Sequence, residues 1–325
     1  MGMNQGKEIV RPPFLREGDK VAFVSPAYWM PQEAIQQAAE AFKSWGLQPI
    51  ISPQANSQDV KAYAGTATER AGDLLWALED DDIKAIICSR GGYGTLHLLR
   101  LIPREKFREH PKWIVGNGDI TTLLYGIASQ SVQSIYGPMA FQMAFSQGID
   151  AEQLRNILFG VIPQYHLPSH SRNVCGHAEG VLIGGNLTSF NAVAGTGFYP
   201  VPEGDTILFF EEVEESLHNI DRMFYTLMLQ KAFWNVKGVI FGMFMAVRYD
   251  LEFNSVEHML VYHLRNLGIP VCCGLPTGSN VCLPLIEGAP CSLDVTPEGS
   301  TITFHIEGGR QNIVDLKENE QQLMK

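Results

Sequence analysis

The sequence lacks the features that would direct it to nucleic acid or into a membrane. Its 24 Lys and Arg face 35 Asp and Glu, a formal net charge of -11 at pH 7, and it contains no basic run. Nucleic-acid-binding surfaces are usually basic, so no nucleic-acid partner is expected. No stretch approaches the roughly 18 consecutive apolar residues that a membrane-spanning helix needs, so no membrane partner is expected either.

Neither a disulfide framework nor a signal peptide is expected. The six cysteines are scattered through 325 residues without a CxxC pair or a regular spacing, so a disulfide framework is not expected. Residues 1–14 contain no apolar stretch of the kind that signal peptides carry. We therefore expect a cytoplasmic protein.

One cluster of metal-ligand residue types occurs, at His166, His170, Cys175 and His177. Its spacing matches no standard zinc finger. A metal site is the alternative here, but surface histidines in a connecting segment are the better interpretation. We predict no metal and no cofactor.

The chain does have the composition and pattern of a globular protein with two domains. It is 45% hydrophobic and 18% charged, and a domain usually has about 150 residues. The first half alternates strand-like and helix-like segments. A capping box at Thr66 and Glu69 begins one of the helices. Such alternation predicts an α/β fold with a mostly parallel sheet flanked by helices, in which ligands bind beyond the carboxyl ends of the strands. The predicted strands are 20–24, 48–52, 83–88 and 112–115.

The second half has a different pattern. Residues 161–180 carry Pro163, Pro168 and Gly176 with few apolar residues, which is typical of a connection between domains. Helical patterns at about 217–231 and 256–266 interrupt short strand-like pieces. We therefore predict a smaller, β-rich C-terminal domain. Its predicted strands are 206–210, 238–241, 270–273, 291–294 and 301–305.

Eight segments in order resemble the LD-carboxypeptidase family of serine peptidases, which includes the microcin C self-immunity peptidases. Together they span about residues 14–310. The longest is YAGTATERAGDLLWALEDDDIKAIICSRGGYGT at 63–95. The others are GDKVAFVSPA, GNGDIT, YGPM, EGVLIGGNLTSF, ILFFEEVEESLHNIDRM, VKGVIFGMF and GIPVCCGLPTG.

The resemblance implies a fold, an activity and an assembly. The fold is an N-terminal α/β domain with a flavodoxin-like sheet, here 14–165, a linker at 166–177, and a C-terminal β-rich domain at 178–312. Family members hydrolyse the bond between an L-centre and a terminal D-residue. The usual substrate is the murein tetrapeptide, which loses its terminal D-Ala during peptidoglycan recycling in the cytoplasm. Homodimers are also implied.

Two of the three catalytic positions that the resemblance implies hold other residues. The family's nucleophilic serine lies in a G-[FY]-S-D turn, which here reads Gly-Asn-Gly-Asp at 116–119, so Gly118 stands in the serine position. The family's histidine position falls on Ser279 in a loop that is about three residues shorter. A serine cannot serve as general base near neutral pH. The family's glutamate is retained as Glu211, whose alternative role is a structural bond to a hydroxyl or to Arg222.

A glycine-rich turn follows the predicted strand 83–88. The amides of Gly91 and Gly92, with Arg90 and with Asp119 of the altered turn, are candidates for binding an oxyanion or a ligand carboxylate. The alternative is a tight strand-to-helix turn without a ligand. A dinucleotide-binding role is disfavoured because the third glycine of GxGxxG is missing.

Three functions follow from these residues. The first is a catalytically impaired peptidase that binds a peptide ending in a D-amino acid, such as a murein tetrapeptide. The second is an active hydrolase with a rearranged site, and the third is an assembly protein without a ligand. No substitute nucleophile has a histidine at a recognisable spacing. The substitutes considered are Ser25, Ser89, Thr121, Thr122, Cys272 and Cys273.

Overall fold

The computed structural model describes residues 8–57, 62–145, 148–194, 196, 204–230, 232–278 and 281–317. The chain folds into two compact units. The N-terminal unit runs to Gly160 and takes back Leu283–Glu287, and the C-terminal unit holds Val161–Cys282 and the residues from Gly288 on. Among the described helices, none has the length and apolar character needed to cross a membrane.

The N-terminal unit is built on a sheet in the order β11-β5-β4-β3-β1-β2, in which all neighbours but β11 run parallel. The order of its parallel strands, 2-1-3-4-5 when counted from β2, is that of flavodoxin-like folds. Buried apolar runs form the central strands, whose side chains are almost fully excluded from solvent. The strands are β1 (Lys20–Val24), β2 (Gln48–Ile51), β3 (Ile83–Cys88), β4 (Trp113–Gly116), β5 (Ser134–Tyr136) and β11 (Leu285–Glu287).

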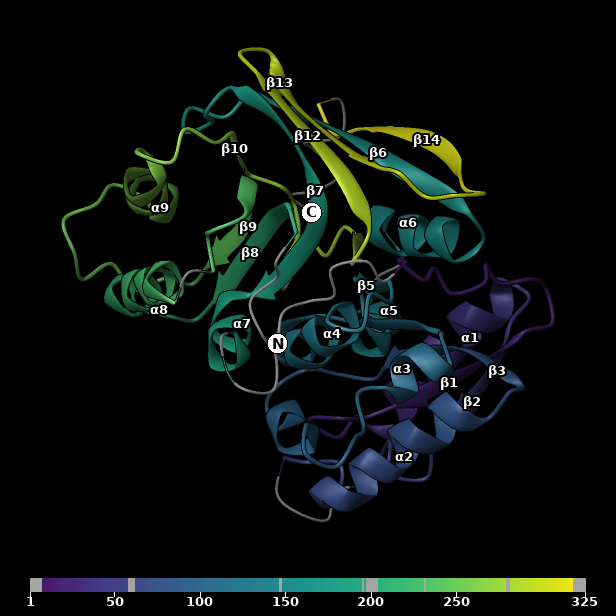
Figure 1. Cartoon of the computed structure of the whole chain (residues 1–325). Coiled ribbons are helices and arrows are strands. Elements are labelled where there is room, and N and C mark those ends of the chain that lie inside the picture. Colours follow the sequence, from purple (N-terminus) through teal and green to yellow (C-terminus); the bar gives the residue numbers. More distant parts are fainter. Residues whose placement is uncertain are drawn as a thin grey trace. The chain divides into compact units, whose positions relative to one another are not determined.

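Helices flank this sheet (Figure 1). Helix α1 presents Ile35, Ala38 and Phe42 on one buried stripe. Helix α2 begins at the predicted capping box, since Thr66 accepts the amide of Glu69 while the Glu69 carboxylate accepts the amide of Thr66. The helices are α1 (Gln32–Ser44), α2 (Ala67–Glu79), α3 (Lys106–Glu109), α4 (Thr121–Ala128), α5 (Ala140–Phe145) and α6 (Ile149–Leu158).

The C-terminal unit is built on an eight-stranded mixed sheet in the order β10-β9-β8-β7-β12-β13-β6-β14. Strands β7 to β10 run parallel to one another, and β12 joins them antiparallel through β7. The strands are β6 (Val161–Pro168), β7 (Gly176–Asn186), β8 (Thr206–Val213), β9 (Val236–Met245), β10 (Val271–Cys273), β12 (Pro290–Thr296), β13 (Gly299–Phe304) and β14 (Arg310–Asp315).

Three helices accompany the parallel part of this sheet: α7 (Leu187–Val193), α8 (Leu217–Leu229) and α9 (Val256–Leu264). Helix α8 packs against both α7 and α9 (Figure 1). Its Phe224 is fully buried and contacts the rings of Phe210 and Phe241 on β8 and β9. The aromatic core therefore fixes α8 directly after the strand that carries Glu211.

The predicted fold class is confirmed, while the division of the chain differs from the predicted 14–165 and 178–312. The predicted linker at 166–177 contains the end of β6 and the start of β7, and β6 pairs with β13 and β14 of the C-terminal sheet. The segment Leu283–Glu287 pairs with β5 and so belongs to the N-terminal unit. With Val161 as its first residue, the C-terminal unit is about as long as the N-terminal unit and is not the smaller domain expected.

Candidate active site

The turn between β4 and α4 has the strand-turn-helix geometry of a nucleophile elbow. Asn117 is extended, and Gly118 has a φ of +57°, in the left-handed region that favours glycine. Residues at the end of β5 fix this turn. The Gly118 amide donates to the Tyr136 hydroxyl at 3.2 Å, and the Asn117 side chain donates to the Gly137 carbonyl at 2.9 Å. The elbow backbone is thus formed at the position where the family serine is expected.

The elbow has room for a side chain at position 118. A Cβ atom placed on Gly118 would have no other atom within 4 Å. The hydroxyl of a nucleophilic serine is absent only because residue 118 is glycine. The backbone of the turn has the conformation of an elbow. The assignment of Gly118 to the nucleophile position stays a prediction.

Asp119 ties the elbow to the glycine-rich turn after β3. Its buried carboxylate accepts the amide of Thr95 at 2.8 Å. Burial raises the pKa of the Asp119 carboxyl, while the Thr95 bonds and the nearby Arg70 charge act in the opposite direction. Because this carboxylate already holds a backbone amide, the structure gives Asp119 a supporting role beside its predicted role in ligand binding.

The predicted oxyanion loop lies directly beside the elbow. A Cβ on Gly91 would lie 3.5 Å from the Asn117 carbonyl oxygen and 3.7 Å from the Asp119 amide nitrogen. The half-buried Arg90 places its guanidinium 4.9 Å from the ring centre of Phe141. Structure thus brings together Arg90, Gly91, Gly118 and Asp119, as the adjacency of β3 and β4 requires.

The loop conformation depends on Gly92, which gives a first testable prediction. Gly92 has a φ of +104°, and a Cβ there would lie 2.3 Å from the Tyr28 ring. We expect Gly92→Ala to lower the free energy of unfolding by about 1–3 kcal/mol, because the ring or the loop must move, and to weaken ligand binding.

Thermal unfolding and titration calorimetry check this expectation. Gly72→Ala is the matched control, since a Cβ on Gly72 in α2 meets no atom within 4 Å and alanine favours a helix by up to about 1 kcal/mol. An unfolding temperature for Gly92→Ala equal to that of the natural chain would contradict the assigned geometry.

The C-terminal unit carries the retained acid. Glu211 on β8 is buried, and a Cβ placed on Gly278 would lie 3.5 Å from its Oε2 atom. The carboxylate of Glu211 therefore lies next to the residue that precedes Ser279. Ser279 itself lies outside the described residues. Arg222, one alternative partner of Glu211, donates to the Asn219 side chain at 2.9 Å.

The neighbouring acid, Glu212, has a structural role that the sequence did not predict. Its buried carboxylate accepts the Asn186 side chain at 2.7 Å, the Thr188 amide at 2.8 Å and hydroxyl at 2.7 Å, and the Val213 amide at 2.9 Å. These bonds fasten the start of α7 to β8. Of the two adjacent glutamates, Glu212 is thus committed to the fold.

The substitute nucleophiles considered from the sequence are buried, and several are engaged. Ser25 donates to the Ala55 carbonyl and Thr122 to the Asp119 carbonyl. Burial raises the pKa of the Cys272 thiol to about 11, so it is protonated at neutral pH. Burial also raises the pKa of Cys273. Ser89 and Thr121 are completely enclosed.

The histidine-rich segment supports no metal centre in the part of the chain that is described, where no group of three or more His, Cys, Asp or Glu could hold an ion. His177 instead bonds Asp294 through Nδ1 at 2.7 Å. The hydrogen bond to the Asp294 carboxylate raises the pKa of His177.

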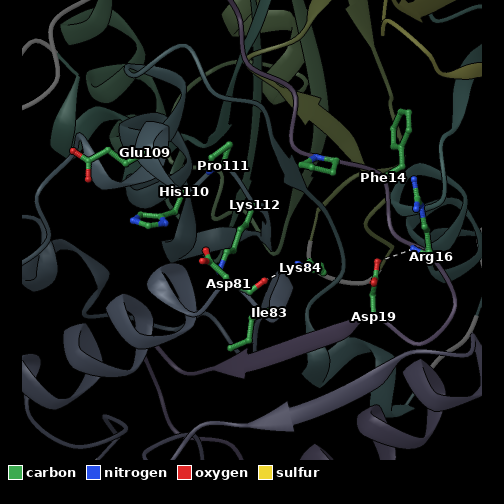
Figure 2. A pocket seen from close by; sticks show the side chains of 11 residues that line it. Phe14, Arg16, Asp19, Asp81, Ile83, Lys84, Glu109, His110, Pro111 and Lys112 are labelled. Carbon is green, nitrogen blue, oxygen red and sulfur yellow. Dashed lines mark hydrogen bonds between the residues drawn. The ribbon is translucent and has the colours of Figure 1, made fainter.

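A separate cavity of about 420 Å³ lies at the amino ends of β1, β3 and β4, the opposite edge from the elbow (Figure 2). Its buried lysine, Lys112, donates to the carbonyls of Ala77 at 3.0 Å and Asp80 at 2.5 Å, and so closes the C-terminal end of α2. Burial lowers the pKa of Lys112 to about 8, although the charges of Asp80 and Asp81 favour its charged form. Because the Nζ atom of Lys112 is engaged by the fold, we do not place the peptide site here.

The sequence analysis missed the pair formed by His218 and Asp250. The two are 32 positions apart, and the Nδ1 atom of His218 is hydrogen-bonded to the Asp250 carboxylate. Only the pairing of β8 with β9 brings their loops together, so no local pattern could have found the pair.

Comparison with known proteins decides the family. The family model described as the LD-carboxypeptidase N-terminal domain matches residues 21–137, and the LD-carboxypeptidase C-terminal domain matches residues 179–293. The chain belongs to the LD-carboxypeptidase family. A protein of Synechocystis sp. named as a carboxypeptidase is 34% identical over 304 residues, covering 92% of this chain and 98% of the relative.

Two further relatives of this LD-carboxypeptidase-family chain carry more specific names. The murein tetrapeptide carboxypeptidase of Pseudomonas aeruginosa is 27% identical over 80% of this chain and 87% of its own length. The crystal structure of muramoyltetrapeptide carboxypeptidase from Oxalobacter formigenes matches with a TM-score of 0.79 and 25% identity, over 88% of this chain and 99% of that one. The resemblance predicted from the sequence is confirmed.

Proposed function

We propose that this chain binds a peptide ending in a D-amino acid, of the murein tetrapeptide type, and does not hydrolyse it by the serine chemistry of its family. The observation that carries the proposal is the elbow: its backbone has the conformation that presents a nucleophile, yet Gly118 has no side chain. The name of the Pseudomonas aeruginosa relative supports the choice of ligand.

The expected loss of activity is large. In subtilisin, removal of the serine or the histidine alone lowers kcat by about a millionfold. What remains without the triad is a rate about 10³–10⁴ times that of the reaction in water, from oxyanion binding and substrate binding. Gly118 and Ser279 remove both groups at once. We therefore place turnover at or below this residual level.

Each unit keeps polar groups that can bind a ligand. In the N-terminal unit, Gly91 lies beside the elbow, and its amide, the Gly92 amide and the Arg90 guanidinium can bind a carboxylate or a carbonyl oxygen. Glu211 remains beside Gly278 and can accept a hydrogen bond from a ligand. Binding thus needs no group that the sequence has lost.

One experiment tests this proposal. The purified chain is titrated with L-Ala-γ-D-Glu-meso-diaminopimelate-D-Ala in a calorimeter, and the released D-Ala is measured in parallel. We expect saturable binding, with release no faster than about 10⁴ times the uncatalysed rate. Release at ordinary enzyme rates would favour the active hydrolase with a rearranged site. No binding would favour an assembly protein without a ligand.

Assembly and location complete the proposal. We propose a homodimer, for which light scattering should give twice the chain mass of 36.1 kDa. We propose a cytoplasmic location, consistent with six cysteines that are all free thiols in the structure.

A further inference from the structure

The glycine-rich turn after β3 places a guanidinium close to two aromatic rings. The Cζ atom of Arg90 is 4.9 Å from the ring centre of Phe141 and 5.9 Å from that of Tyr28. Both aromatic residues are fixed to the turn by their backbones. The Phe141 amide donates to the Ser89 carbonyl at 2.9 Å. The Tyr28 amide donates to the Gly91 carbonyl at 3.3 Å. The residues on either side of Arg90 therefore hold the two rings next to it.

The guanidinium of Arg90 has donors to spare. Among the residues that the structure describes, none accepts a hydrogen bond from this guanidinium and none forms an ion pair with it. The nearby Arg70, by contrast, donates to the carbonyls of Pro26 and Gly94. A guanidinium presents five donors in a planar fork that matches a carboxylate. Because Arg90 is half-buried, a ligand carboxylate can reach these donors.

Further rings extend the apolar surface beside the guanidinium. The Phe145 ring centre lies 5.0 Å from that of Phe141, and 67% of Phe145 is exposed. From Tyr28 the rings continue to Tyr63 at 5.9 Å, and from Tyr63 to Tyr93 at 6.3 Å. Tyr93 is 46% exposed. Exposed apolar side chains that gather at one place indicate a binding surface, whereas single ones do not.

The last residue of a peptide carries both groups that this turn can recognise. Its carboxylate and its side chain are attached to the same α carbon, so a carboxylate paired with Arg90 brings the side chain to the neighbouring rings. A ring buries far more apolar area there than the methyl group of alanine. Aromatic pairs with centres about 4.5–7 Å apart also attract each other beyond the effect of buried area, which favours a ring over an aliphatic side chain.

We propose that the bound peptide ends in an aromatic D-amino acid, whose carboxylate pairs with Arg90 and whose ring packs against Phe141 and Tyr28. This proposal rests on the proposed function, because it needs a peptide with a D-residue at its end to be bound, and it names the class of that residue. Every group that it uses belongs to the N-terminal unit.

A purely structural contact of Arg90 with the two rings is the competing explanation, since cation–π contacts stabilise protein surfaces without any ligand. The two explanations differ in what they predict for a series of ligands. A contact that only supports the fold gives the same affinity for every terminal side chain. A contact that selects the ligand gives an affinity that depends on that side chain.

The test uses four tetrapeptides that differ only in the last residue: D-Ala, D-Leu, D-Phe, and D-Phe with its carboxyl group converted to an amide. Each is titrated into the full chain in a calorimeter. We expect the D-Phe peptide to bind about tenfold more tightly than the D-Ala peptide, with D-Leu between them. The amide should bind at least about tenfold more weakly than the D-Phe acid, because its charge-assisted bonds to Arg90 are lost.

Two variants assign these preferences to their side chains. In Phe141→Leu, the preference for D-Phe over D-Ala should fall to about threefold or less, because the leucine side chain has no ring. In Arg90→Gln, the D-Phe acid and the D-Phe amide should bind with similar affinities, because the charge that distinguishes them is gone.

Phe159→Leu is the matched control for Phe141→Leu. Phe159 is also half-buried, and the Cζ atom of Arg155 lies 5.4 Å from its ring centre. It belongs to the same unit but lies at the other edge of the sheet: a Cβ on the next residue, Gly160, would lie 2.9 Å from Phe14, which lines the cavity there. This variant should keep the tenfold preference for D-Phe.

Each contrary result has a separate meaning. Equal affinities of the natural chain for the D-Ala and D-Phe peptides, or for the D-Leu and D-Phe peptides, overturn the aromatic selection and leave the binding proposal intact. A tenfold preference that persists in Phe141→Leu, or an amide that binds the natural chain as tightly as the acid, also overturns it. A natural chain that binds none of the four peptides overturns both proposals. The series on the natural chain is sufficient if a variant fails to fold.

Discussion

A variant that combines Gly118→Ser with Ser279→His and a three-residue insertion before Asn280 is expected to release D-Ala roughly 10³-fold faster than the natural chain, since a positioned base alone contributes about 10²–10⁴. The elbow has room for the hydroxyl, because a Cβ on Gly118 meets no atom within 4 Å. Within the C-terminal unit, the Glu211 carboxylate lies next to Gly278, beside the loop to be changed.

The single variants are the controls for this gain. Gly118→Ser alone and the altered 279 loop alone should each gain less than about tenfold, because triad members act as a unit and their effects are not additive. Glu211→Gln in the combined variant should cancel most of the gain. A combined variant that folds, binds the peptide and remains as slow as the natural chain would show that Gly118 and Ser279 are not the lost catalytic positions.

Gly184→Ala is expected to prevent stable folding of the C-terminal unit. Gly184 on β7 pairs with Phe209 on β8, and a Cβ there would lie 1.8 Å from the Phe209 carbonyl oxygen. Neither backbone can withdraw without opening the parallel pair at the centre of the sheet. We expect a loss of more than about 4 kcal/mol in the free energy of unfolding, at the extreme of single substitutions.

Urea unfolding followed by circular dichroism measures this loss, or soluble yield where the variant does not fold. Gly204→Ala in the same unit is the matched control, because a Cβ on Gly204 meets no atom within 4 Å. Its effect should stay within about 0.5 kcal/mol. A Gly184→Ala variant with natural stability would mean that β7 and β8 lie farther apart than described.

The sequence predicted those elements whose signals are local. Strands 20–24 and 83–88 match β1 and β3 in full, because each is a buried apolar run that ends at a turn. The capping box at Thr66 fixed the start of α2 in the same way.

Elements that depend on distant partners were missed or misassigned. The prolines of 161–168 suggested a connection, yet this segment is β6, where Pro163 lies just outside the stretch paired with β13. The strand 285–287 follows the C-terminal unit in sequence but pairs with β5 of the N-terminal unit.

The candidate site divides in the same way. The family pattern singled out Gly118, Arg90 and Glu211 as candidates, because the residues around them follow motifs in order along the chain. The pair of His218 and Asp250 could not be found like this, since Asp250 reaches His218 only through the pairing of β8 and β9. A contact between residues of two different loops has no fixed spacing in the sequence by which it could be recognised.

The return of Leu283–Glu287 to the N-terminal sheet has a consequence for how this chain can be divided. The polypeptide passes from one unit to the other after Gly160, again before Leu283, and once more after Glu287. A fragment ending at Gly160 would leave β5 as an exposed edge strand with unpaired amides and carbonyls. Such an edge strand promotes aggregation. A stable N-terminal fragment would therefore need Leu283–Glu287 added back, because neither unit is one continuous stretch of the chain.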